Sequence, residues 1–142
     1  MRTVVAVGMF IGLIAVGAAC STVPAVPPTP SAAAMYQTIT IDEFAAALDQ
    51  PDVYTVINVH IPYEGEVPNT DDQIPYHDID ALTTALPDRN APIILYCRSG
   101  RMSEEASRAL VALGYTSVVD VPGGMNAWMA SGRELLMSGN GA

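Results

Sequence analysis

The chain has 142 residues, half of them hydrophobic, which predicts one ordinary core and a single folded domain. All six basic residues are arginines, and the fifteen carboxylates give a formal net charge of -9. So acidic a chain is a poor partner for nucleic acid, and any anionic ligand would need local arginines and backbone N–H groups to hold it.

Residues 1–19 predict a signal peptide. Arg2 precedes an uncharged apolar run over 4–19, and small residues stand directly before Cys20. The run is shorter than the roughly 20 residues of a membrane-spanning helix, which favours a cleaved signal over a permanent anchor. Its end resembles a bacterial lipobox, which implies a lipid on Cys20. Because Gly17 replaces the larger aliphatic residue usual there, plain secretion stays open. We expect an exported bacterial protein on the periplasmic side, lipid-anchored to the inner or outer membrane.

Residues 20–35 predict an extended linker, because they combine prolines with small residues and carry no charge. The folded domain is expected over 36–136 and a flexible tail over 137–142. If Cys20 carries lipid, Cys97 is the only free thiol of the mature chain, and an exported protein that keeps such a thiol is expected to use it. An inert buried Cys97, or a disulfide between Cys20 and Cys97, stays open.

The predicted elements alternate between helix and strand. Thr40 and Glu43 have capping-box spacing before an apolar helical face, and Gly114 ends a later amphipathic helix. In chain order we expect a helix at 42–49, a strand at 54–59, a helix at 78–86, a strand at 92–96, a helix at 103–113, a strand at 116–121, a turn at 122–124 and a helix from 125. This alternation predicts an α/β fold, with a mostly parallel central sheet and helices on both faces.

Cys97 falls at the carboxyl end of a predicted strand, just before a helix start, where open α/β sheets place their ligands. Unpaired N–H groups of the loop and of the first helical turn favour an anion there, and a thiolate is such an anion. Arg98 and Arg101 add positive charge, Gly100 allows a tight turn, and Ser103 is predicted as the helix N-cap. The pattern favours a reactive thiol over a structural cysteine.

Residues 94–103 look like the active-site loop of single-domain rhodaneses, and the resemblance continues through 106–115 and 120–128. It implies a rhodanese-like fold and a sulfurtransferase without cofactor or metal. A thiosulfate-type anionic donor would leave a persulfide on catalytic Cys97, and a thiol or cyanide-like acceptor would remove the outer sulfur. The implied substrate-binding residues are Arg98, Ser99, Gly100, Arg101, Met102 and Ser103. Arg101 is expected to contact the donor, and Trp128 to pack in the core. The oligomeric state is left open.

The first half departs from that family. Asn58-Val59-His60 stands where rhodaneses usually carry Asp-Val-Arg, so the family's ion pair cannot form and donor specificity is open. Residues 61–76 are polar and proline-punctuated, and predict a surface loop that forms one wall of the pocket. We expect His60 and His77 in surface or hydrogen-bonded structural roles, and the carboxylates of Glu64 and Glu66 in solvent.

Two other functions are compatible with parts of the sequence. A cell-division-cycle-type cysteine phosphatase, on a related fold, needs a longer loop and an arginine six positions after the cysteine, where this chain has Ser103. A non-catalytic, membrane-tethered binding module would keep the fold and lose donor binding, but the intact Cys97 loop favours an enzyme.

Overall fold

The structure is a computed structural model that describes residues 35–137. The predicted signal peptide, Cys20, all of the linker except Met35, and residues 138–142 lie outside the described residues. Between residues 35 and 137, no helix is long and apolar enough to cross a membrane.

A five-stranded sheet forms the centre of the domain, with strand order β1-β5-β4-β2-β3, and every neighbouring pair runs parallel. The strands are β1 (Gln37–Thr38), β2 (Thr55–Asn58), β3 (Asp72–Gln73), β4 (Ile93–Tyr96) and β5 (Val118–Asp120). The three longer ones were predicted, whereas the two edge strands, of two residues each, were not. The predicted α/β class with a parallel sheet is confirmed.

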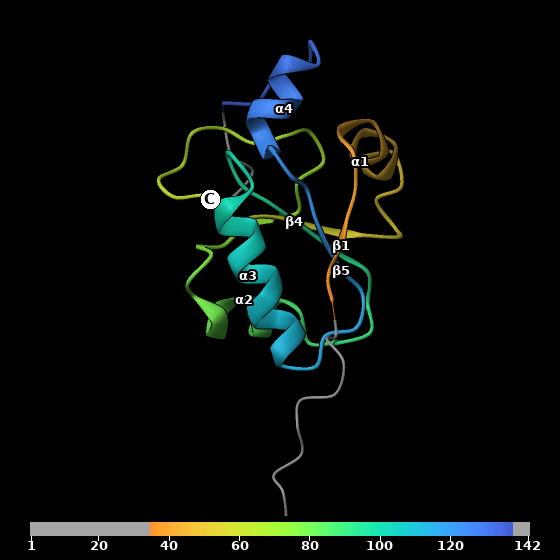
Figure 1. Ribbon diagram of the computed structural model, residues 1–142, viewed down its shortest axis with the longest axis vertical. Helices are drawn as coiled ribbons and strands as arrows, with labels where there is room; N and C mark the ends of the chain where they lie inside the picture. Colours follow the sequence, from red (N-terminus) through yellow and green to blue (C-terminus); the bar gives the residue numbers. More distant parts are fainter. Residues whose placement is uncertain (1–34, 138–142) are drawn as a thin grey trace, which may run out of the picture.

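Within residues 35–137 four helices cover the sheet, all near their predicted positions: α1 (Ile41–Leu48), α2 (Ile79–Ala85), α3 (Arg101–Ala112) and α4 (Gly124–Ala130). α2 and α3 lie on one face, and α1 lies on the opposite face (Figure 1). The predicted capping box starts α1, because Thr40 accepts from the Glu43 N–H while the Glu43 carboxylate accepts from the Thr40 N–H.

The core consists of two layers because successive β4 side chains point to opposite faces. Ile93 and Leu95 pack beneath α2 and α3, and Ile94 and Tyr96 pack beneath α1 and α4. In the second layer the Phe44 ring lies 5.8 Å from the Trp128 ring, centroid to centroid. Trp128 is only 6% exposed, so its predicted packing role in the core is confirmed.

The segment 61–76 is more buried than the predicted surface loop. Val67 is fully buried and Glu66 is 4% exposed, so the expectation of a solvated Glu66 is wrong. The reason is a bridge to the end of the described chain: Glu66 and Leu136 exchange two backbone hydrogen bonds of 2.9 and 2.8 Å. The hydroxyl of buried Tyr96 also accepts from the Val67 N–H at 3.1 Å.

Candidate active site

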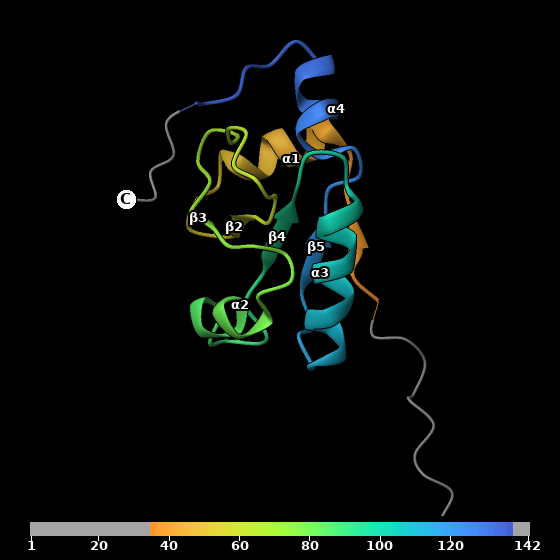
Figure 2. The same ribbon diagram turned by 90° about the vertical axis from the view of Figure 1, so that its left-hand side faces the viewer.

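Cys97 follows β4 directly, at the carboxyl edge of the sheet. Figure 2 shows the β4 arrow pointing toward the loop from which α3 begins. Cys97 is a free cysteine and is 1% exposed. Two groups converge on its sulfur: the Gly100 N–H donates to Sγ at 3.1 Å, and the Ser103 hydroxyl donates at 3.7 Å. These are the donors that stabilise a thiolate.

α3 begins at Arg101, two residues before the predicted start, so the prediction of Ser103 as N-cap is wrong. The N-cap is Gly100, with φ of +98°. Glycine reaches this left-handed conformation without the clash that a Cβ would cause, so the chain turns directly from the loop into the helix. Ser103 therefore sits inside the first turn, where its single hydroxyl proton has two alternative acceptors, the Gly100 carbonyl at 3.1 Å and the sulfur at 3.7 Å.

The first turn of α4 fixes the backbone of the cysteine loop. The Met125 N–H donates to the Cys97 carbonyl and the Asn126 N–H to the Arg98 carbonyl, both at 2.9 Å. A Cβ built on Gly124 would lie 1.9 Å from the Cys97 carbonyl oxygen, so only glycine fits there. Sequence reasoning identified the turn but missed this contact, because nothing in the local pattern says what packs against it.

The two loop arginines differ in their surroundings. One terminal nitrogen of Arg98, Nη1, lies 2.7 and 2.8 Å from the two carboxylate oxygens of Glu64. Arg101 is 68% exposed, and its nearest carboxylate is Glu105 at 3.9 Å. An ion pair at that distance between exposed side chains contributes little to stability. Much of the Arg98 charge is therefore offset by Glu64, and Arg101 is the freer cation of the two.

The remaining predicted loop residues have different environments. Ser99 is exposed at the loop tip, whereas Met102 is half-buried and packs against the core under α2 and α3. Glu104 pairs with Arg108 one turn further along α3.

Where rhodaneses usually carry Asp-Val-Arg, Asn58 and His60 hold the neighbouring loop. The Asn58 side chain donates to the Gly65 carbonyl at 3.1 Å and accepts from the His60 N–H at 3.0 Å. His60 Nε2 lies 2.7 Å from Glu64 Oε2, so His60, Glu64 and Arg98 form one chain of polar contacts. The His60 hydrogen bond lowers the pKa of Glu64, and Arg98 adds to the effect while burial opposes it. His77, by contrast, is exposed beside the Tyr76 ring.

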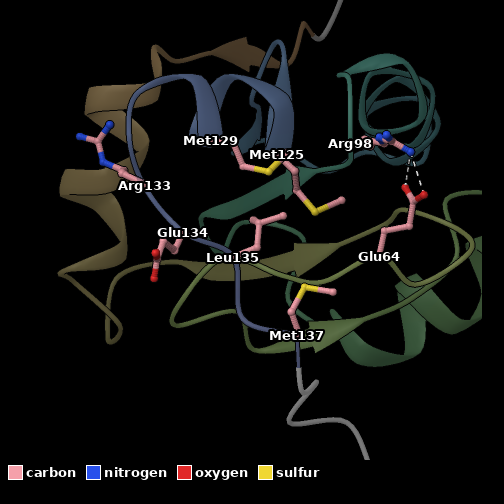
Figure 3. A pocket seen from close by; sticks show the side chains of 8 residues that line it. All are labelled: Glu64, Arg98, Met125, Met129, Arg133, Glu134, Leu135 and Met137. Carbon is pink, nitrogen blue, oxygen red and sulfur yellow. Dashed lines mark hydrogen bonds and ion pairs between the residues drawn. The ribbon is translucent and has the colours of Figure 1, made fainter.

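A cavity of about 530 Å³ opens beside the cysteine loop. Figure 3 shows Glu64 and Arg98 facing each other at one end, Arg133 at the other, and methionine side chains between them. Cys97 itself does not line the cavity, but its neighbour Arg98 does. Met137, which the sequence assigns to the tail, also lines it. The described residues that line it are Glu64, Arg98, Met125, Met129, Arg133, Glu134, Leu135 and Met137. Among residues 35–137, no three His, Cys, Asp or Glu side chains group in a way that could hold a metal ion.

Comparison with known proteins agrees with this geometry. The rhodanese-like domain family matches residues 42–131, well over half of the chain. A sulfurtransferase of Allochromatium vinosum is 31% identical over 91 residues, which is 62% of this chain and 82% of that protein. Thiosulfate sulfurtransferase PspE of Escherichia coli is 34% identical over 70 residues, 47% of this chain and 67% of that one.

Solved structures show the same fold. A rhodanese-like domain protein from Staphylococcus aureus has 28% identity and a TM-score of 0.56, covering 72% of this chain and 99% of that one. A rhodanese-related protein from Thermoplasma volcanium has 25% identity and a TM-score of 0.59, covering 72% of this chain and all of that one. With Cys97 on the loop between β4 and α3, the chain belongs to the rhodanese-like domain family.

Proposed function

We propose that the protein is a sulfurtransferase that carries sulfane sulfur as a persulfide on Cys97. The observation that carries this proposal is the convergence of the Gly100 N–H and the Ser103 hydroxyl on Cys97 Sγ, at the carboxyl end of a central parallel strand. Donors fixed around a sulfur stabilise its anionic form, which is the nucleophile. The names of both relatives support sulfur transfer, and that of PspE supports a thiosulfate-type donor.

The reaction divides into two displacements at sulfur. The Cys97 thiolate attacks the outer sulfur of thiosulfate, a new S–S bond forms, and the donor's S–S bond breaks with sulfite leaving as the anion. A nucleophilic acceptor, a thiolate or cyanide, then attacks the outer sulfur of the persulfide. The Cys97 thiolate leaves and is ready for the next donor. Each displacement is the kind of exchange that thiolates perform at disulfide sulfur.

Intact-mass spectrometry of the full chain tests the proposal. After thiosulfate treatment the protein should gain the mass of one sulfur atom, and peptide mapping should place it on Cys97. Cyanide should then remove that mass. If the protein stays unmodified with thiosulfate and with other sulfane donors, the proposal is wrong.

Arg101 is expected to hold the anionic donor, because it is exposed beside the loop and only loosely paired. In Arg101→Ala we expect the KM for thiosulfate to rise about tenfold, the effect of one charge-assisted hydrogen bond. The matched control is Arg108→Ala, which removes the same charge at nearly the same exposure, 67%, further along α3. Equal effects in the two variants would mean that only net charge matters.

A non-catalytic binding module remains the second candidate, and one observation favours it. The sulfur of Cys97 is buried and does not line the large cavity. The cavity would then hold a partner, with no sulfur chemistry. The mass experiment separates the two functions, because a module takes up no sulfur.

A further inference from the structure

Glu64 is a carboxylate beside the cysteine loop that the reaction described above does not use. Its two carboxylate oxygens lie 2.7 and 2.8 Å from Nη1 of Arg98, the residue that directly follows Cys97. Figure 3 shows the two side chains facing each other at one end of the cavity. They are 37% and 53% exposed, so their ion pair adds little to stability. Its consequence is for charge, because a ligand that reaches the loop meets a guanidinium already paired with a carboxylate.

The segment that carries Glu64 is hydrogen-bonded on both sides of it. The side chain of fully buried Asn58 donates to the Gly65 carbonyl at 3.1 Å and accepts from the His60 N–H at 3.0 Å. The His60 carbonyl also accepts from the Gln73 side chain at 3.0 Å. Because Asn58 belongs to β2 and Gln73 to β3, the backbone around Glu64 is fixed to the sheet.

Strand register brings this segment to the edge of the sheet where the sulfur lies. β2 and β4 are parallel neighbours with Asn58 opposite Tyr96, and the Val59 N–H donates to the Tyr96 carbonyl at 2.9 Å. Neighbouring strands lie about 4.8 Å apart. The residues after Asn58 therefore leave the sheet beside the residues after Tyr96, of which Cys97 is the first.

His60 adds no second cation to this group. Its Nε2 lies 2.7 Å from Glu64 Oε2, and a carboxylate only accepts, so Nε2 carries a hydrogen. His60 is 7% exposed, and among the described residues its Nδ1 has no hydrogen-bond partner. A further proton on Nδ1 would bury a charge and an unpaired N–H, which is costly. His60 is therefore neutral, and the charges of His60, Glu64 and Arg98 sum to zero.

We propose that Glu64 is a positioning residue that sets the charge specificity for the sulfur donor. By holding Arg98 it selects against the second negative charge of thiosulfate and favours donors that carry a single negative charge. This inference rests on the proposed function. A thiosulfonate is such a donor. The Cys97 thiolate attacks its sulfane sulfur, a new S–S bond forms, the donor's S–S bond breaks, and a sulfinate leaves with the bonding electron pair.

Two donors that differ in charge test the proposal: the thiosulfate dianion and the methanethiosulfonate monoanion. Intact mass gives the rate at which each converts Cys97 of the full chain to the persulfide. Glu64→Gln keeps the size of the side chain and an oxygen that can accept from His60, and removes the charge. It should raise the ratio of the thiosulfate rate to the methanethiosulfonate rate about fivefold, the effect of a unit charge several ångströms away near a protein surface. The gain should shrink at about 1 M salt.

The matched control is Glu134→Gln. It removes the same charge from the same cavity, and Figure 3 shows Glu134 on the far side of that cavity from Arg98. Its donor ratio should stay within about twofold of the parental ratio, because solvent screens the more distant charge. Equal rises in the two variants would mean that only net charge acts, and would overturn the inference.

A double-mutant cycle asks whether Glu64 acts through Arg98. If it does, most of the gain from Glu64→Gln should disappear when the same change is made in Arg98→Ala, because no guanidinium is left to release. A gain that persists in full in the Arg98→Ala protein would assign the effect to the carboxylate alone, and the positioning role would be wrong.

Alkylation of Cys97 measures the same charge effect without a sulfur donor. Iodoacetate and iodoacetamide each form an S–C bond and release iodide, and they differ by one negative charge. In the Cys20→Ser full chain, Glu64→Gln should raise the ratio of the iodoacetate rate to the iodoacetamide rate. A loosened loop or a larger thiolate fraction would raise both rates and leave their ratio unchanged. An unchanged ratio would therefore contradict the proposal.

The two kinds of experiment let the two proposals fail separately. If neither donor transferred sulfur but the alkylation ratio rose in Glu64→Gln, the sulfurtransferase would be wrong and the charge selection at Cys97 would stand. If both donors transferred sulfur and neither ratio changed, only the role of Glu64 would be wrong.

Discussion

Cys97→Ser, in the full chain, is expected to take up no sulfur from thiosulfate and to form no thiocyanate from cyanide. A serine hydroxyl stays protonated at neutral pH and its oxygen cannot carry the sulfane sulfur, so the loss of turnover should be about 10³-fold or more. The variant should still fold. Cys97 is buried, but a serine side chain fits the same space, and its oxygen can accept the hydrogen bond that the Gly100 N–H donates to the sulfur. Thiocyanate formation and intact mass measure the loss, and circular dichroism checks the fold.

The control for this experiment is Cys20→Ser, which changes the other cysteine of the chain in the same way. It should retain sulfur uptake in full, since the proposed chemistry assigns Cys20 no part. If sulfur uptake persisted in Cys97→Ser and disappeared in Cys20→Ser, the sulfur carrier would be Cys20, and the proposal would be wrong.

The central elements of this fold were predictable because their sequences carry strong local patterns. β4 is an uninterrupted apolar run and α1 has a complete capping box, so both lie within two residues of their predicted bounds. The edge strands β1 and β3 were missed for the opposite reason. Each has two polar, largely exposed residues and forms only because a neighbouring strand offers its backbone groups.

The start of α3 shows two local rules in competition. Ser103 followed by glutamates has the composition of a helix N-terminus, but Gly100 allows the turn three residues earlier. The earlier start wins because the Gly100 carbonyl accepts the first helical hydrogen bond, from the Glu104 N–H at 3.0 Å. The serine is thereby released from capping and placed against the sulfur.

The partners of the candidate site were the least predictable part. Glu64 contacts Arg98 across 34 positions of sequence, and a carboxylate in a polar loop gives no sign that it will neutralise a particular arginine. Asp120 is a second example. A polar residue at the end of a strand is usually exposed, but Asp120 is buried because α3 packs against β5. Local patterns placed the cysteine, whereas the polar groups packed around its loop depend on tertiary contacts.

Gly124→Ala is expected to damage stability and sulfur transfer together. The added Cβ would lie 1.9 Å from the Cys97 carbonyl oxygen and 2.8 Å from its carbon, so backbone must move. That movement breaks the hydrogen bonds by which Met125 and Asn126 hold the cysteine loop. We expect a loss of about 4 kcal/mol or more in the free energy of unfolding, in the range of the most disruptive single substitutions. Urea unfolding measures it, and intact mass after thiosulfate should show little uptake in the fraction that stays folded.

Gly132→Ala separates this steric effect from the cost of a left-handed backbone. Gly132 has φ of +84°, further into the left-handed region than the +47° of Gly124, yet nothing lies within 4 Å of its Cβ position. Its loss should be only about 1–2 kcal/mol, the cost of that conformation for an ordinary residue, with sulfur uptake unchanged. If both variants lost similar amounts of stability, backbone conformation would explain the effect at Gly124, and the first turn of α4 would not be what holds Cys97 in place.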